Sequence, residues 1–578
     1  MADGNTNFTW IDVVIILGYL ALLVSIGVYF SRRQKGIESF FLAGRRMGWL
    51  PIGLSLMAAL NSGIDYVAGP STIFKFGLIF TAGVLSWVFL YPWVAYVSLP
   101  FYRRLQTVSA YEYLERRFNV GVRTLAACIF LLWRIGWMGT AMYVPALAIE
   151  AITGGRIRTV PLIIVIGTVV TIYTMLGGIQ AVIWTDVIQF CIMLTGVAVA
   201  IGVILYNLDG GVTAVWSLAA AEGKTSFSFN LNIPDNASPW DRVRLYFAEP
   251  RAMSAIVIAA VVGRMAGYTS DQVMVQRFQT TKSLKDSRQA FIINAVGDAV
   301  WTLGLAFVGL ALFAYFQTHA LPEQFRENTD KVFPYFMANV FPTGVIGLVV
   351  AAVLAASLSS IDSGINSCTS VVVVDFYNRL FLGRQVNASG MGVASASDTE
   401  VCANPAALDS PRPDSAADQR EQLLVSRIAN LCFGLLGIII ASNVGRLGIV
   451  LEIGAKVIQT FTGPILAIYL LGMFSRRARS YGVIVGGVLG TGVALYIAFV
   501  DTGITFVWPT VFGFVTTIVV GYAASLPLPR PEGEQGLELT WRRVMRKPLP
   551  DDVAEARDPG GRGLTDPAPF APTVPHSH

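Results

Sequence analysis

Serine residues recur at helical spacing within an apolar run over residues 343–376. Positions 356, 360, 363, 367 and 370 are three or four residues apart, so they share one face of a helix, and all but Ala356 carry a hydroxyl group. Asp362 adds a carboxylate to the same stretch. Because hard cations prefer oxygen ligands, this face is a candidate Na⁺ site. The alternative is that the serines only bond their own helix backbone or hold neighbouring helices together.

Charged side chains inside apolar runs are a second group that could do chemistry. Asp65, Asp186 and Arg264 each lie in a stretch that is otherwise mostly apolar. A charge at the centre of a bilayer costs roughly 2.5–3.5 kcal/mol even on insertion scales, so each is a candidate functional residue. Asp65 and Arg264 could contact a solute, or they could form a structural ion pair with each other. Further charges in apolar runs have no assigned role: Arg134, Asp298, Glu452 and Lys456.

Two of these charges lie beside sequences that interrupt a helix. Asp65 follows an Asn-Ser-Gly sequence at 61–63, and Arg264 lies in a segment that runs from Gly263 to Gln272. In lipid, a broken helix is tolerated only where the break is buried or lines a cavity. The two breaks are five apolar runs apart, and an odd separation reverses their orientation across a membrane. Paired breaks in two inverted halves are typical of secondary transporters, which bind solute and ions near the midplane.

The elements that must position these residues are apolar helices. Of the 578 residues, 54% are hydrophobic and 14% are charged, whereas soluble globular proteins carry about 25% charged residues. Apolar runs of about 20 residues recur along the chain, each long enough to cross a hydrocarbon core of ~30 Å. This pattern predicts an all-α polytopic membrane protein with about 13 transmembrane helices. The predicted spans are 10–30, 48–69, 77–100, 124–150, 159–177, 179–206, 252–276, 289–316, 343–376, 424–443, 447–473, 481–500 and 504–526.

The composition also excludes several classes of function. Only three histidines occur, and the five cysteines contain no CxxC pair, so a metal centre or histidine-based catalysis is not expected. We therefore predict that the chain is not an enzyme and uses no organic cofactor. The net charge of +5 is modest and gives no indication of nucleic-acid binding. The expected partners are a small-molecule solute, Na⁺ and the lipid bilayer, and the sequence predicts no particular oligomeric state.

Basic residues predict the orientation of the chain. Clusters of Lys and Arg follow the first, third, seventh and eleventh predicted spans, which places them on one side of the membrane. The positive-inside rule assigns that side to the cytoplasm, with the N-terminus outside and the C-terminus inside, in the plasma or inner membrane. Residues 383–422 and 527–578 are poor in large apolar residues and are predicted to be a disordered loop and tail on the cytoplasmic side.

Several stretches resemble the sodium:solute symporter family. They are Phe41-Leu42-Ala43-Gly44-Arg45, Ser-Ala-Tyr-Glu-Tyr-Leu at 109–114, Gly177-Gly178 ahead of Trp184-Thr185-Asp186, and Val275-Gln276-Arg277. Together with the serine-rich run, the resemblance covers about residues 40–474. Within the family, the chain looks most similar to the sodium/iodide, monocarboxylate and multivitamin cotransporter branch. This resemblance implies sodium coupling and an inverted five-helix repeat of leucine-transporter type, formed by spans two to eleven.

The resemblance also implies which residues bind sodium and solute. The shared sodium site of the family corresponds to the backbone carbonyls of Ala58, Asn61 and Ala356 and the hydroxyls of Ser359 and Ser360. A second sodium position found in some members corresponds to Asp186, Ser359, Asp362 and Ser363. Solute contacts correspond to Leu60, Asp65, Trp137, Arg264, Tyr268 and Gln272.

Three of these residues depart from the family pattern. Asp65 and Arg264 place charges where relatives of the iodide branch have glutamine and an aromatic residue, which argues against iodide and favours a carboxylate or a zwitterion. Asp362 stands where family members often have serine. It could strengthen the second sodium position, or it could bind a proton instead.

These expectations define a domain organisation and a function. Residues 1–47 would form an extra helix and a cytoplasmic loop, 48–206 and 252–473 the two repeats, and 207–251 an outer loop. Residues 474–526 would add two helices, followed by the tail 527–578. The predicted activity is sodium-coupled import of a monocarboxylate, vitamin or amino acid by alternating access. A proton-coupled symporter of the same fold and a membrane solute sensor are the alternatives.

Overall fold

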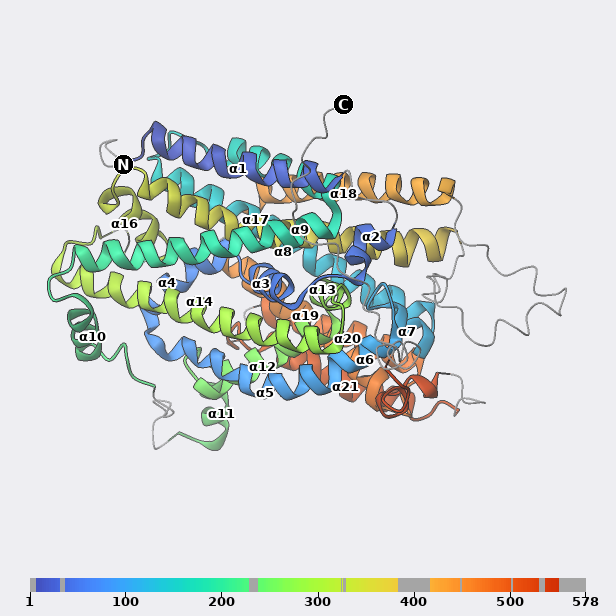
Figure 1. Cartoon of the computed structure of the whole chain (residues 1–578). Helices are drawn as coiled ribbons and strands as arrows, with labels where there is room; N and C mark the ends of the chain where they lie inside the picture. The colour runs from blue at the N-terminus through green and yellow to red at the C-terminus, as the bar shows by residue number, and fades with distance from the viewer. Residues whose placement is uncertain are drawn as a thin grey trace, which may run out of the picture.

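Long helices that run roughly side by side make up the structure (Figure 1). This computed structural model describes residues 7–31, 37–227, 237–323, 325, 329–382, 416–446, 450–500, 503–529 and 536–549. Within these residues, ten helices are long and apolar enough to cross a membrane, or eleven if one bent pair is counted as a span. The only β pairing in the described part is a single bridge between Met47 and Thr281.

In chain order, the helices are grouped into those before residue 250 and those after it. The first group contains α1 (Trp10–Ser31), α2 (Ile37–Leu42), η1 (Ala43–Arg45), α3 (Trp49–Leu60), α4 (Gly63–Phe76), η2 (Leu78–Leu85), α5 (Ser86–Trp93), η3 (Val94–Ser98), α6 (Leu99–Leu105), α7 (Glu112–Arg117), α8 (Val120–Ile152), α9 (Thr159–Tyr206), α10 (Gly211–Ala221) and α11 (Pro239–Ala248). The second group contains α12 (Met253–Ser270), α13 (Gln272–Gln279), α14 (Leu284–Thr318), η4 (Thr329–Lys331), α16 (Val332–Val340), α17 (Val345–Val371), η5 (Val372–Phe381), α18 (Ala416–Val444), α19 (Val450–Phe474), α20 (Ser480–Phe499), α21 (Pro509–Ser525), η9 (Leu537–Leu539) and α22 (Trp541–Val544).

The two ends of the helix assembly carry different short helices. One end carries α10 and α16, and the other carries α6 and α7 (Figure 1); we call them the α10 face and the α7 face. On the α7 face, Arg103 donates to the Thr281 carbonyl (3.0 Å) and Arg117 to the Ser475 carbonyl (2.7 Å). Arg45 donates to the carbonyl of Thr107 (3.4 Å). These contacts bring Arg45, Arg103 and Arg117, from two of the four basic clusters expected from the sequence, to the same face.

The count of 13 spans is not confirmed by the length and hydropathy of the helices. The spans predicted at 159–177 and 179–206 lie within the single 48-residue helix α9, which is kinked at Gly178. A straight helix of that length would extend about 72 Å, more than twice the ~30 Å of a hydrocarbon core. The last predicted span corresponds to α21, which has only 17 residues. The number of crossings therefore stays a prediction.

The first predicted helix break lies between α3 and α4, which meet at an angle of 62°. Asn61 and Ser62 have extended backbone there. Ser62 begins α4 by a capping box, in which its hydroxyl accepts from the Ile64 amide (3.2 Å) and the Asp65 carboxylate accepts from the Ser62 amide (2.8 Å). The capping box therefore stabilises the start of α4 as a new helix, separate from α3.

The second predicted break is shorter than the sequence indicated. The helix α12 continues through Gly263 and Gly267 as far as Ser270, and only Asp271 is extended. Asp271 then caps α13, since its carboxylate accepts from the amide of Val273 (3.0 Å). The break is buried. The hydroxyls of Tyr102 and Tyr111 donate to the carbonyls of Thr269 and Ser270 there.

Helix α17 lies inside the assembly, packed against α8, α9 and α1. Its side chains are buried without interruption from Val349 to Val371. Small residues permit this close packing: a Cβ added to Gly196 of α9 would lie 2.3 Å from the Cβ of Ala352. The hydroxyl-bearing face expected in this run is therefore held against other helices rather than lipid.

Two predictions of disorder are partly wrong. Residues 416–422, which the sequence places in a flexible loop, belong to α18, whereas 383–415 lie outside the described residues. In the predicted tail, residues 536–549 contain η9 and α22, and the side chain of Val544 is fully buried. The segment packs on α6, α7 and α19. Residues 550–578 lie outside the described part of the chain. The predicted loop 207–251 also contains two helices, α10 and α11.

Candidate functional site

Five oxygen atoms expected from the sequence meet at the break between α3 and α4. The hydroxyl of Ser359 donates to the carbonyls of Ala58 and Ala356, each at 2.9 Å. The hydroxyl of Ser360 donates to the carbonyl of Asn61 at 3.0 Å. All five residues are buried. We call this group of three carbonyls and two hydroxyls the oxygen cluster.

The break explains why these carbonyls are available. The last carbonyls of α3 have no partner further along the helix, because the backbone turns away at Asn61. Two hydroxyl hydrogens cannot satisfy all the lone pairs of five oxygens, so the oxygen cluster has spare acceptor capacity. Its donor set contains only neutral oxygen ligands, which suits a hard monovalent cation such as Na⁺. The residues present therefore fit a sodium ion.

The second predicted sodium position is arranged differently. Asp186 forms an ion pair with Arg277 at 2.8 Å, and both side chains are completely buried. The same guanidinium group donates to the hydroxyl of Ser363 at 2.5 Å. Ser363 links Asp362 to this ion pair, since the carboxylate of Asp362 accepts from the hydroxyls of Tyr173 (2.7 Å) and Ser363 (3.2 Å). The four residues lie in one buried polar region, in which Arg277 already supplies a positive charge to Asp186.

A cavity of about 390 Å³ lies beside the oxygen cluster. Of the six predicted solute contacts, it brings together Leu60, Asp65 and Arg264. Its other lining residues include Asn61, Asp298 and Trp301. The cavity extends along α4 to Ile73, close to the turn in which the amide of Leu78 donates to the carbonyl of Lys224, just beyond α10 (2.7 Å). It therefore lies toward the α10 face.

Arg264 is the cationic side chain of this cavity. Its guanidinium group donates to the carboxylate of Asp298 (3.0 Å), to the Gly83 carbonyl (2.6 Å) and to the Ser86 hydroxyl. It also lies over the ring of Trp87, 4.7 Å from the centroid. The Arg264 side chain is 19% exposed, against 3% for Asp298. Arg264 can therefore contact a solute while Asp298 holds it from behind.

The sequence left open an ion pair between Asp65 and Arg264, and the structure does not contain it. The carboxylate of Asp65 instead accepts from the amide and the hydroxyl of Ser62, at 2.8 and 2.9 Å. Both bonds use the same carboxylate oxygen. Asp65 and Arg264 are thus two separate charges that face one cavity.

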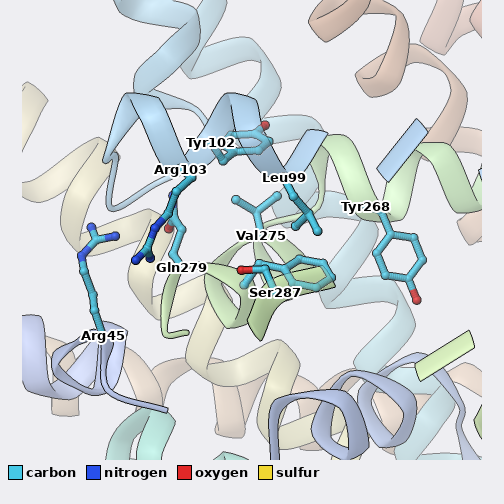
Figure 2. Close-up of a pocket in the computed structure, with 9 residues that line it drawn as sticks. Arg45, Leu99, Tyr102, Arg103, Tyr268, Val275, Gln279 and Ser287 are labelled. Atoms are coloured by element: carbon cyan, nitrogen blue, oxygen red, sulfur yellow. The ribbon is translucent and has the colours of Figure 1, made fainter. Parts of the chain in front are cut away.

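The other three predicted solute contacts lie elsewhere. Gln272 is buried, with its amide bonded to Ala110 (2.8 Å), Val108 (3.2 Å) and Ser370 (3.1 Å). Trp137 is a buried residue of α8 and lines neither of the cavities described here. Tyr268 lines a second, smaller cavity near the α7 face (Figure 2).

This smaller cavity is narrow. Tyr268 and Arg45 lie at its opposite ends, with Tyr102 and Val275 between them (Figure 2). Its volume of about 20 Å³ has room for about one water molecule. The smaller cavity is therefore too small to hold an organic solute.

Sequence reasoning missed three charged contacts of the site. Asp298 holds Arg264, Arg277 neutralises Asp186, and Arg134 of α8 forms an ion pair with Asp271 at the second helix break. Arg134 is buried, with 5% of its surface exposed. A charge within an apolar span was the available signal for Asp298 and Arg134, but the spacing along the chain does not reveal which charges pair.

Comparison with known proteins gives consistent results. Among curated proteins, the sodium/sialic acid symporter NanT of Aliivibrio fischeri is 29% identical over 525 residues, which is 89% of this chain and 93% of that protein. The sodium/sialic acid symporter SiaT of Proteus mirabilis is 29% identical over 541 residues, 92% and 98% of the two chains. The human sodium-coupled monocarboxylate transporter 1 is 28% identical over 501 residues, 86% of this chain and 74% of that protein. These relatives are transporters and not enzymes.

Solved structures agree on the fold. A substrate-bound, outward-open Na⁺-coupled sialic acid symporter matches with a TM-score of 0.75 and 28% identity, covering 91% of this chain and 99% of that chain. A transporter of the nucleobase-cation-symport-1 family matches with a TM-score of 0.51 and 12% identity, covering 86% and 97%. The helices therefore adopt the inverted-repeat, leucine-transporter type of fold. The model of the sodium:solute symporter family matches residues 40–394 and 409–490, and the chain therefore belongs to that family.

Proposed function

We propose that the protein is a sodium-driven symporter that imports a small zwitterionic or carboxylate solute by alternating access. The observation that carries this proposal is the oxygen cluster, where Ser359 and Ser360 of α17 meet the carbonyls at the α3–α4 break. An ion bound there would join α17 to the break between α3 and α4. Sodium binding would thereby stabilise one arrangement of α3, α4 and α17 over others.

The charges of the cavity favour a solute that carries both signs. Asp65 and Asp298 contribute two negative charges and Arg264 one positive charge, so the cavity residues sum to −1. A single Na⁺ in the neighbouring oxygen cluster would balance this charge. A zwitterion then adds no net charge, with its carboxylate toward Arg264 and its ammonium group toward Asp65.

Arg264 retains the donors that such a carboxylate needs. A guanidinium group has five N–H donors, and three are used on Asp298, Gly83 and Ser86. Two remain for a solute. Relatives named as symporters of sialic acid and monocarboxylate also handle solutes that carry a carboxylate.

The orientation follows from the basic residues. Clusters of Arg and Lys lie on the α7 face, which the positive-inside rule assigns to the cytoplasm of the plasma or inner membrane. The larger cavity would then be reached from outside. Each Na⁺ that enters would contribute about 2.3 kcal/mol per 100 mV of membrane potential, and about 1.4 kcal/mol per tenfold concentration difference.

Uptake into liposomes tests the proposal. Purified protein is reconstituted, an inward Na⁺ gradient is imposed with a K⁺ gradient as control, and labelled amino acids, monocarboxylates, vitamins and sugars are compared. We expect saturable, Na⁺-dependent accumulation of a zwitterion or carboxylate. Accumulation driven only by a pH gradient would show that protons, and not sodium ions, drive the transport. Sodium binding without accumulation of any solute would contradict transport and favour the sensor.

A further inference from the structure

Asn61 belongs to both the oxygen cluster and the solute cavity. Its backbone carbonyl accepts from Ser360 in the cluster (3.0 Å). Its side-chain amide donates to the carboxylate of Asp298 (3.1 Å) and to the carbonyl of Met57 (3.1 Å). Both hydrogens of the amide are therefore used, and the side chain has one defined orientation.

Asp298 connects this amide to the cationic side of the cavity. One carboxylate oxygen accepts from Asn61, and the other accepts from Arg264 (3.0 Å) and from the indole of Trp87 (2.8 Å). The residue is 2% exposed. A buried carboxylate that loses a partner is costly, so movement of one donor is transmitted to the others.

From this geometry we infer that Asp298 is a positioning residue that couples the oxygen cluster to Arg264. A cation that binds the Asn61 carbonyl fixes the residue whose side chain holds one oxygen of Asp298. The other oxygen then orients Arg264, which lines the cavity and has two N–H donors left for a solute. Ion binding thereby prepares the cavity for a carboxylate before the solute arrives. The inference rests on the proposed sodium site.

The competing explanation is that Asp298 only neutralises Arg264. In that case the pair between α12 and α14 would be structural, and ion binding would leave the surroundings of Trp87 unchanged. The two explanations differ in one measurable respect: whether Na⁺ at the oxygen cluster changes the environment of Trp87.

Tryptophan fluorescence of the full-length protein in nanodiscs makes this measurement, with Na⁺ as the only ligand and choline as its replacement. The signal of Trp87 is obtained as the difference between the parent protein and Trp87→Phe. Binding of labelled Na⁺ is measured in parallel, and fluorescence changes are compared at saturating Na⁺. We expect a Na⁺-dependent change in the parent protein that depends on Trp87.

Asn61→Ala is the decisive variant. It keeps the backbone carbonyl in the oxygen cluster, and it leaves the contacts of Asp298 with Arg264 and Trp87 in place. We expect the Trp87 response at saturating Na⁺ to be lost although Na⁺ still binds. Asp298→Asn should lose it as well, and a thermal midpoint near that of the parent verifies folding. Thr302→Val, one helical turn along α14 in the same cavity wall, is the control and should keep the response.

The outcomes separate the two proposals. If the parent protein binds no Na⁺, the proposed function fails. If Na⁺ binds but Trp87 does not respond, or if Asn61→Ala responds as the parent does, the coupling through Asp298 is wrong and the sodium site stands.

Discussion

At the scale of single residues, the hydroxyl of Ser360 should decide the affinity for sodium. We expect Ser360→Ala to raise the Na⁺ concentration for half-maximal uptake by about tenfold, since losing one ligand of about 1.4 kcal/mol has that effect. The maximal rate at saturating Na⁺ should change less. Ser357→Ala is a matched control, because this buried serine of α17 forms no hydrogen bond among the described residues. Equal Na⁺ dependence of the two variants would contradict the ligand role.

The sequence predicts individual ligands better than it predicts pairs. Ser360 could be found because helical spacing places it on one face with other serines, and the family resemblance adds Ser359 and names the partners of both. Arg264 was recognised as a cavity residue, but its partner Asp298 was not. Two residues that lie 34 positions apart on different helices meet only through the packing of those helices, which no local spacing encodes.

At the scale of elements, the kink in α9 depends on Gly178. Its φ of 58° is unfavourable for residues with a side chain, and an added Cβ would lie 2.8 Å from the carbonyl oxygen of Phe40. We expect Gly178→Ala to destabilise the protein by about 1–3 kcal/mol from the backbone conformation alone, with the steric contact adding to this. A lower thermal midpoint in detergent would reveal it.

Gly202→Ala provides the matched control on the same helix. Gly202 has ordinary helical backbone, and an added Cβ would meet nothing within 4 Å. This substitution should leave the thermal midpoint unchanged or raise it slightly. If both glycine variants lowered the midpoint equally, the kink would not be the reason for the loss at Gly178.

The acidic helix start of α7 gives a prediction for pH. Glu115 is partly buried, which raises the pKa of its carboxyl, but pairing with Arg379 and Arg123 outweighs burial and holds the pKa below its usual value. Its stabilising contribution is therefore present at neutral pH and is lost as the pH falls through this lowered pKa. Glu115→Gln should lower the thermal midpoint at pH 7 and have less effect in acid. Glu222→Gln, at an exposed position, should have little effect at either pH.

Element boundaries were predicted with uneven success. The break at residues 61–62 was found because Asn, Ser and Gly adjoin there, and Ser62 and Asp65 form the cap that their types allow. The second break was expected around Gly263–Gln272, yet only Asp271 leaves the helix. Gly263 and Gly267 stay within α12, whose helical backbone continues to Ser270, so composition alone overestimates the length of the break.

At the scale of the whole molecule, residues 536–549 join parts of the chain that are far apart. Arg104 of α6 donates to the carbonyl of Lys547 (2.8 Å), and Trp541 packs beside Phe474 of α19, with ring centroids 6.0 Å apart. Sequence composition predicted disorder here because the tail as a whole is polar. The prediction failed for this stretch because its few apolar residues, including Val544, are buried against the α7 face. Composition averaged over the tail conceals such a short docking segment.

Alternating access requires the α7 face to open, and the docked segment spans that face between α6 and α19. We therefore expect Val544→Asp, which places a charge at a fully buried position, to release the segment. Trypsin should then cleave at Arg542 and Arg543 severalfold faster, and the initial rate of Na⁺-driven uptake should rise because the closed face loses stabilising contacts. Pro548→Asp introduces the same charge at an exposed position and should change neither cleavage at Arg542 and Arg543 nor uptake, with cleavage after Lys547, which Pro548 blocks in the parent, measured separately. Faster cleavage with unchanged uptake would show that the segment docks without restraining the transport cycle, and unchanged cleavage would contradict docking through Val544.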